Sequence, residues 1–347
     1  MNEDRYAYLR TRTVSDQGPH KFFFALTLHQ CAELLPRLLG SIVEVARFLG
    51  PQNCALSIVE LESADGTFEI LKTLRKDLDD LGLLYYLSAN ESLPNYPKGN
   101  TDVLEGFPEP RNNALRPLID HKNQFDENST VISLSAVSAC PDDILELIHQ
   151  RFLQNADMTC AMDWIGTLWW DPVFHDVFVA RGMTGECFYW IPDTGGRDFA
   201  SKLFWNDPES RSRLNATLPF QVFSCWNGAV AFTAKPIMSR RIRFRTRYEG
   251  ECLLTGAKEL FCKDMWDSGY DRIAVVPSVN LEYSDEAARK IKDVKGYVQQ
   301  WTSNEGHDVK IDWKQDPPET VRCIFTYDQQ EMMPWDAGLA GRVENSG

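Results

Sequence analysis

Hydrophobic and polar positions alternate along the chain in blocks that are typical of an α/β protein. Short apolar runs, rich in aromatic and β-branched residues and therefore predicted as buried strands, cover 22–28, 54–60, 83–88, 130–137 and 158–162. Segments with a wide apolar face at helical spacing cover 33–49, 68–81, 112–121 and 141–153. Strand and helix thus alternate, and this order predicts a doubly wound, mainly parallel sheet flanked by helices.

Three parts are expected along the 347 residues. We predict an N-terminal arm over 1–19, a single α/β catalytic domain over 20–300, and a partly irregular C-terminal extension over 301–347. Within the domain, four prolines and two glycines make 90–110 a long loop. Loops of this length inside a compact domain are usually functional or mobile.

Composition and charge favour a cytoplasmic enzyme. Hydrophobic residues make up 43% of the chain, which is enough for a large core. The net charge of −14 argues against sequence-blind binding to DNA or to an anionic membrane, and the chain starts without an apolar targeting segment. The nine cysteines form no paired C-x-x-C motifs, and several lie in apolar runs. They are predicted to be buried free thiols of a reducing compartment.

Three acidic residues crowd the start of the predicted helix 141–153. Asp142, Asp143 and Glu146 form a D-D-x-x-E string behind Pro141. One interpretation is structural, because proline suits the first helical position and acids in the first turn favour the positive end of the helix dipole. The other is functional, because open α/β sheets bind ligands at this edge, where carboxylates can pair with a guanidinium or accept a proton.

Five arginines fall in the segment SRRIRFRTR. They are Arg240, Arg241, Arg243, Arg245 and Arg247. Their alternation with other residues predicts a strand with one basic face. Two interpretations stay open, contact with an RNA backbone or a charged edge strand that blocks aggregation.

Five segments resemble the fungal capsule-associated α-1,3-mannosyltransferase family, whose members have a GT-A-type nucleotide-sugar fold. They are SIVELESADGTFEILKTL (57–74), PEPRNNALRPL (108–118), CAMDW with WWDPVFHDVFVARGMTGE (160–186), FSCWNGAVAFTAKPI (223–237) and GECLLTGAKELFC (250–262). The resemblance extends over roughly 20–285 and implies a GT-A-like fold. In a transferase, Asp65 and Asp163 would help to bind the nucleotide, while Trp226 and Asn227 would shape the pocket.

Two features depart from that family's pattern. Its members typically have an N-terminal membrane helix, and none is visible in this sequence. They also usually carry an Asn-Asp pair at the end of the strand 130–137, with a carboxylate placed to hold a divalent metal. Ser135 and Ala136 stand at those places. Because hard cations need anionic oxygen ligands, neither a metal nor another cofactor is expected.

With these departures and its D-D-x-x-E string, the chain looks like a subset of this fold, the fungal arginine-containing cyclodipeptide synthases. The similarity implies that arginine from arginyl-tRNA is condensed with an amino acid from a second aminoacyl-tRNA into a diketopiperazine, in secondary metabolism. Asp142, Asp143 and Glu146 would act in catalysis, and the arginine-rich segment would hold RNA. The alternatives are a soluble sugar-nucleotide-dependent mannosyltransferase and an inactive binding protein. The second amino acid and the oligomeric state stay open.

Overall fold

The computed structural model describes residues 2–11, 20–89, 108–169, 171–252, 256–303 and 308–339. The loop predicted at 90–110 falls outside the described residues, apart from its last three positions. Those three positions already belong to helix α6 (Pro108–Asp120).

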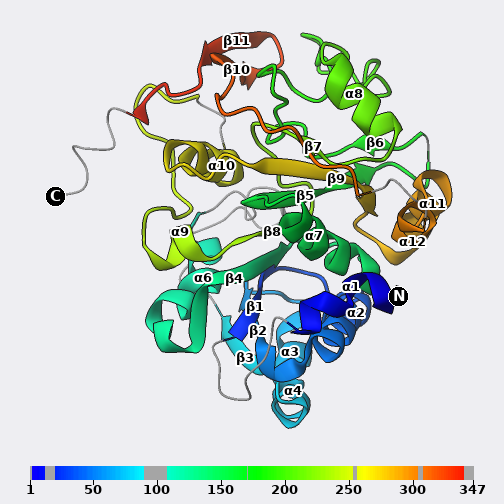
Figure 1. The fold of residues 1–347 in the computed structure, drawn as a ribbon, viewed down its shortest axis with the longest axis vertical. Coiled ribbons are helices and arrows are strands. Elements are labelled where there is room, and N and C mark those ends of the chain that lie inside the picture. Colours follow the sequence, from blue (N-terminus) through cyan, green and yellow to red (C-terminus); the bar gives the residue numbers. More distant parts are fainter. Residues whose placement is uncertain are drawn as a thin grey trace.

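One mixed sheet runs through the molecule in the order β3-β2-β1-β4-β8-β5-β9-β7, with β6 paired to β5 (Figure 1). Its strands are β1 (His20–Leu28), β2 (Cys54–Glu60), β3 (Leu84–Ala89), β4 (Phe125–Leu134), β5 (Met158–Ile165), β6 (Val173–Phe174), β7 (Phe220–Gln221), β8 (Ala229–Thr233) and β9 (Ile273–Leu281). Strands β1 to β5 and β9 all run parallel, whereas β8 and β7 run antiparallel to their neighbours. The predicted doubly wound, mainly parallel α/β sheet is confirmed.

Helices cover both faces of this sheet (Figure 1). One face packs on α1 (Glu3–Thr11), α2 (Leu35–Leu49), α7 (Pro141–Leu153) and α12 (Val298–Thr302). The other packs on α6, α9 (Lys235–Met238) and α10 (Ala257–Asp267). The remaining helices are α3 (Thr67–Thr73), α4 (Arg75–Leu81), α8 (Pro208–Asn215) and α11 (Asp285–Lys295).

Strand β1 shows why these residues build a sheet buried on both sides. Phe22 and Phe24 point into the core beneath α2 and α7, whereas Phe23 and Ala25 point into the core beneath α6. All four are nearly inaccessible to solvent. Because successive side chains of a strand face opposite ways, an unbroken apolar run is what a central strand requires.

Several local predictions differ from the structure. The single helix expected at 68–81 is divided into α3 and α4, with Leu74 between them. The arginine-rich strand is absent, because residues 240–247 form turns and irregular backbone. Helices α1, α10 and α11 were not predicted from the sequence.

Both described ends of the chain pack against the body. In α1, the side chains of Tyr6 and Leu9 are fully buried. Near the other end, β10 (Thr320–Thr326) and β11 (Gln329–Pro334) form an antiparallel hairpin. Arg322 of this hairpin forms an ion pair of 2.6 Å with Glu186. The domain boundaries proposed at 19 and 300 stay predictions. None of the helices in the described part of the chain has the length and apolar character needed to cross a bilayer.

Two disulfides correct the expectation that all cysteines are free. Cys160 of β5 is bonded to Cys225, and Cys252 is bonded to Cys323 of β10. The partners lie 65 and 71 residues apart in the chain, a separation that carries no sequence signal. The thiols of Cys31, Cys54, Cys140, Cys187 and Cys262 are free.

This pairing predicts a thiol count that can be checked directly. In denaturant without reductant, the purified chain should expose the five free thiols, and after reduction all nine cysteines should react. A Cys252→Ser/Cys323→Ser variant should lose about 2–4 kcal/mol of unfolding free energy, because its unfolded state is no longer cross-linked. As a control, reductant should lower the melting temperature of this variant less than that of the wild type. Nine reactive thiols before reduction would contradict the pairing.

Candidate active site

The carboxyl ends of the parallel strands meet at one edge of the sheet, and polar residues gather there. Asp163 lies near the end of β5, Tyr283 follows β9, and Asn227 precedes β8. The segment after β5 turns back through β6, and this turn adds His175 and Asp176 to the group. Open α/β sheets bind their ligands at this edge.

Asp163 is a carboxylate that is fully buried from solvent. Its Oδ2 accepts a hydrogen bond of 2.6 Å from the Tyr283 hydroxyl, while its Oδ1 has no partner among the described residues. Burial, reinforced by the nearby charge of Asp176, raises the pKa of Asp163 to about 8. A carboxyl group with such a pKa can hold or release a proton near neutral pH.

Asp176 is held in place by the turn before β8. The backbone N–H of Asn227 donates to Asp176 Oδ2 at 2.9 Å, and the Asn227 side chain donates to the carbonyl of Ala161 at 2.8 Å. Asn227 has φ 55° and Gly228 has φ 80°, so both are left-handed. A Cβ on Gly228 would lie 3.3 Å from the Cβ of Asp163. The Asn-Gly pair therefore permits both the turn and the close approach.

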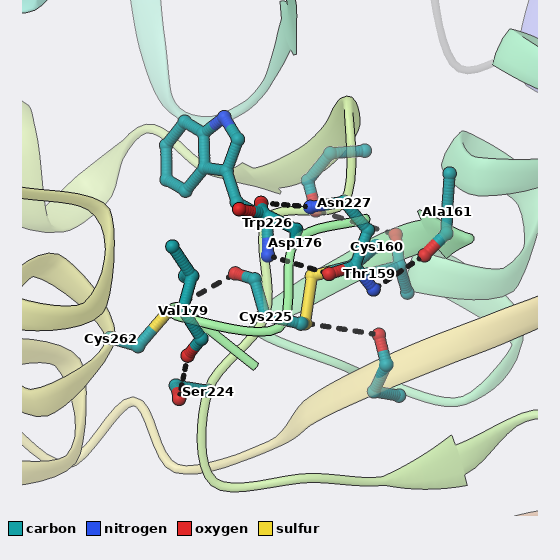
Figure 2. Close-up of a disulfide and its surroundings, with 12 residues drawn as sticks. Thr159, Cys160, Ala161, Asp176, Val179, Ser224, Cys225, Trp226, Asn227 and Cys262 are labelled. Carbon is teal, nitrogen blue, oxygen red and sulfur yellow. Dashed lines mark hydrogen bonds between the residues drawn. A yellow bond between two sulfur atoms is a disulfide. The ribbon is translucent and has the colours of Figure 1, made fainter. Parts of the chain in front are cut away.

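A disulfide fixes the start of this turn, as Figure 2 shows. The bond between Cys160 and Cys225 links β5 to the residue just before Trp226, and Asn227 reaches from there to Ala161. Trp226 itself is fully buried, and the guanidinium of Arg111 lies 5.7 Å from the centre of its ring. Trp226 thus contributes core packing behind the site.

Asp176 opens onto a cavity of about 450 Å³. Two cations, Lys258 and Arg197, line it together with His175. The Nζ of Lys258 lies 4.0 Å from Asp176 Oδ2. The ring of His175 packs edge-on against Tyr283, with centroids 5.0 Å apart, which links the cavity wall to the buried Asp163. Aromatic walls come from Tyr189, Phe178 and Tyr327.

Asp65 lies on the β1–β2 side of the same edge. Its carboxylate accepts hydrogen bonds from the backbone N–H of Ala32 at 2.9 Å and from the Thr67 hydroxyl at 2.6 Å. These bonds outweigh the opposing effect of its slight burial and lower the pKa of Asp65. Asp65 joins the loop after β1 to the start of α3, and a role in binding a nucleotide remains a prediction.

The end of β4 does not provide the ligands that a divalent metal prefers. Ser135 and Ala136 follow the strand, and the Ser135 hydroxyl is buried without a partner. In the described part of the chain, no group of three histidine, cysteine or acidic side chains could hold a metal ion. A hydroxyl and a methyl group are poor ligands for a hard cation. No chemical step is therefore assigned to a metal.

The structure gives Asp142, Asp143 and Glu146 hydrogen-bond partners on other segments of the chain. Glu146 accepts hydrogen bonds from Arg5 at 2.8 and 2.9 Å, and from Tyr6 at 2.8 Å. Asp143 accepts from the Lys292 ammonium and caps the backbone of Cys140, and Asp142 accepts from Asn2 and Gln299. These contacts fasten α1, α11 and α12 to α7. None of the three carboxylates lines the cavity beside Asp176.

The five arginines of the arginine-rich segment divide into two groups. Arg245 is buried, and its guanidinium binds Glu251 at 2.7 Å and Asp264 at 2.8 Å. The exposed ones are Arg240, Arg241, Arg243 and Arg247. They lie on turns and irregular backbone, so the alternation in sequence does not place them on one face of a strand.

Asp176, His175, Lys258 and Tyr283 were not among the site residues predicted from the sequence. Asp176 and His175 lie in the quoted segment 160–186, but nothing in their spacing marks them. They reach Asp163 only because β6 turns back on β5. Tyr283 follows β9, whose last residues had not been predicted as strand.

The fold and this edge define the class of protein, a doubly wound α/β protein with a ligand site at the carboxyl ends of its parallel strands. A family profile described as "Cryptococcal mannosyltransferase 1" matches residues 21–264. The "Alpha-1,3-mannosyltransferase CMT1" of Cryptococcus neoformans var. neoformans serotype D is 35% identical over 323 residues, covering 87% of this chain and 67% of that protein. The chain belongs to the cryptococcal mannosyltransferase 1 family.

Solved structures show weaker likeness. The crystal structure of S. aureus TarS 1–349 is 13% identical, with a TM-score of 0.43 over 79% of this chain and 63% of that chain. Mannosyltransferase PcManGT from Pyrobaculum calidifontis, solved with GDP-Man and Mn²⁺, is 13% identical with a TM-score of 0.42, covering 81% and 68%. The chain spans about two thirds of the length of these proteins.

The family assignment corrects the functional hypothesis drawn from the D-D-x-x-E string. A cyclodipeptide synthase that uses arginyl-tRNA and a second aminoacyl-tRNA is wrong, because both the family profile and the identified relative are mannosyltransferases. The predicted contact of the arginine-rich segment with tRNA depended on that hypothesis and is therefore wrong as well. The resemblance to the mannosyltransferase family is confirmed.

The contacts of Glu146 predict a structural role that can be measured. Glu146→Gln removes a buried charge and leaves the Arg5 guanidinium without its main partner, so about 3 kcal/mol of unfolding free energy should be lost. Asp308→Asn is the matched control, because Asp308 also pairs with Arg5 but is half exposed, and it should cost about 0.5 kcal/mol. Chemical denaturation of both variants checks this. Equal stabilities would show that Glu146 does not fasten α1.

The raised pKa of Asp163 predicts a pH-dependent stability. Its folded pKa of about 8 lies above the value of about 4 in an unfolded chain, so folded protein retains a proton that unfolded protein loses. This contribution is fully present below about pH 4 and is lost as the pH rises toward 8. Asp163→Asn, which cannot ionise, should therefore melt increasingly above wild type across this window, by about 4 °C or more at pH 8.5.

The control for this effect is Asp171→Asn, because Asp171 is an exposed carboxylate on the loop after β5. Its melting temperature should follow the wild type at every pH. A constant difference between Asp163→Asn and wild type from pH 4 to 9 would show that Asp163 is already ionised in the folded protein.

Proposed function

We propose that this protein transfers a mannosyl group from a nucleotide-activated mannose to a hydroxyl group of a saccharide. The observation that carries the proposal is the 35% identity to an α-1,3-mannosyltransferase over 87% of the chain. The family match at 21–264 also contains Asp163, Asp176, Asn227 and Lys258. These four residues of the candidate site therefore lie within the matched segment, whereas Tyr283 lies beyond it.

The cavity beside Asp176 offers the groups that such a transfer needs. The bond between the sugar C1 and the phosphate oxygen breaks, and a bond from C1 to the acceptor oxygen forms. Asp176 is placed to accept a hydrogen bond from the acceptor hydroxyl and to orient it. Lys258 and Arg197 line the same cavity and would oppose the negative charge that grows on the departing diphosphate.

Asp163 lies behind the wall of this cavity. It is buried, and it contacts Tyr283, whose ring packs on His175 at the cavity wall. With a pKa of about 8, the carboxyl group is largely protonated at neutral pH. Asp163 does not line the cavity, whereas Asp176 does, so Asp176 is assigned as the group that accepts the proton of the acceptor hydroxyl.

The two disulfides bear on where the protein works. Disulfides persist in oxidising compartments and are rare in the cytosol. The bonds of Cys160 to Cys225 and of Cys252 to Cys323 therefore support an oxidising compartment rather than the predicted cytoplasm.

Transfer activity tests the proposal. The purified full chain is incubated with GDP-mannose and α-mannobiose, and added hexose is measured by mass spectrometry. The wild type should form the trisaccharide. Asp176→Asn keeps the shape of the side chain but removes its charge, so the rate should fall by about 10²-fold or more with an unchanged melting temperature.

The matched control is Asp171→Asn, an exposed carboxylate of the same segment that does not line the cavity. It should retain transfer to within about twofold. If the wild type transfers no hexose, the proposed function fails. If the Asp176→Asn variant works at the wild-type rate, the assigned site is wrong even though the activity stands.

A further inference from the structure

A second cavity, of about 690 Å³, lies between β5, β9, α8 and the segment from α11 to α12. Three tryptophans and three cations line it, namely Trp164, Trp205, Trp301, Lys202, Arg211 and Lys295. Within the described residues, no aspartate or glutamate lines this cavity. In a chain with a net charge of −14, such a concentration of cations marks a distinct electrostatic environment.

The tryptophan walls are held in fixed positions. Trp164 forms the floor, and its indole N–H donates to Asn280 at 2.8 Å. The indole N–H of Trp301 donates to the carbonyl of Lys295 at 3.0 Å, and a Cβ on Gly296 would lie only 2.6 Å from that nitrogen. Glycine at this left-handed position thus lets the Trp301 ring pack on the backbone. Trp205 is 42% exposed, so its ring is accessible to a ligand.

The cations of this cavity stand apart from the ion pairs found among the described residues. Within the described parts of the chain, Lys202, Arg211 and Lys295 form no ion pair with a carboxylate. The Nζ of Lys295 lies 4.3 Å from the ring centre of Trp164. Burial lowers the pKa of Lys295 because no anion offsets the loss of water around its charge. An anionic ligand would supply this compensation.

The second cavity adjoins the candidate active site through one pair of rings. Trp164 follows Asp163 in β5, and it pairs across the strands with Phe174 of β6, with ring centroids 6.4 Å apart. Phe174 lines the cavity beside Asp176, whereas Trp164 lines the second cavity. The two cavities are therefore neighbours, separated by the rings of Trp164 and Phe174.

We propose that the second cavity binds an anionic saccharide, a sugar ring that carries a carboxylate or a phosphate. Indole rings present a flat, electron-rich face to the C–H groups of a pyranose, while lysine and arginine pair with its anionic group. The choice of a saccharide rests on the proposed sugar transfer. The cavity then selects an acceptor that has an acidic residue next to the reacting sugar.

Binding of matched saccharides to the full chain tests this proposal without requiring transfer. The probes are mannobiose, the same disaccharide with its terminal sugar oxidised to a uronic acid, and mannose 6-phosphate. Binding of each probe is measured by calorimetry and by tryptophan fluorescence at low salt. At least one anionic probe should bind about 10-fold or more tightly than mannobiose. The probe that binds identifies the anionic group as carboxylate or phosphate.

Variants assign the binding to this cavity. Lys295→Gln and Trp205→Ala should each weaken binding of the anionic probe by about 10-fold, and added salt should weaken it in the wild type. Lys76→Gln, on the exposed helix α4, is the matched control and should bind as the wild type does. Hexose transfer to neutral mannobiose should persist in all three variants, which separates failure of this proposal from failure of the proposed function.

Three results would overturn the proposal. The first is equal affinity for mannobiose and both anionic probes. The second is unchanged binding in both Lys295→Gln and Trp205→Ala. The third is tight binding of a single-stranded RNA oligonucleotide that displaces the saccharide and is lost in the same variants, because the cavity would then serve a different polymer.

Discussion

The arrangement of the candidate site depends on one buried carboxylate, Asp163, placed beside a second acid at the end of β5. Such a group is unfavourable unless it is neutral or hydrogen-bonded, and both conditions hold, through its raised pKa and the Tyr283 hydroxyl. The Asn-Gly turn before β8 allows the backbone at Gly228 to lie close to Asp163, and the disulfide at Cys225 fixes the turn. The Asn-Gly turn, the disulfide at Cys225 and the proton on Asp163 therefore together determine the geometry of this edge.

Two carboxylates of α7 and the buried Arg245 are engaged in ion pairs outside this site. Glu146 and Asp143 on α7 bind Arg5 of α1 and Lys292 of α11, and these ion pairs fasten both helices to α7. Arg245 likewise forms buried ion pairs with Glu251 and Asp264. Near the carboxyl edge, Asp176 lines one cavity, and beyond the Trp164–Phe174 pair a second cavity is lined by Lys202, Arg211 and Lys295.

The sequence was informative wherever the signal was local. The apolar run 54–60 and the helix that begins at Pro141 were predicted with the bounds observed, because length and apolar spacing suffice for such elements. The candidate site could be predicted from the sequence only in part. Asp163 and Asn227 stand in marked strings, but Asp176 becomes relevant only after β6 folds back. The partners of Asp142, Asp143 and Glu146 on α11, on α12 and at the start of the chain lie about 140 to 160 positions away in sequence, so spacing alone could not show them.

The protonation of Asp163 is the most direct test of this account. Its carboxyl carbon can be followed by NMR in protein labelled with ¹³C-aspartate, with the signal identified by its loss in Asp163→Asn. The account predicts a titration midpoint near pH 8 in the wild type, and a lower midpoint in Asp176→Asn, where the neighbouring negative charge is removed. A midpoint near pH 4, as in a solvated aspartate, or one that does not move in Asp176→Asn, would contradict it.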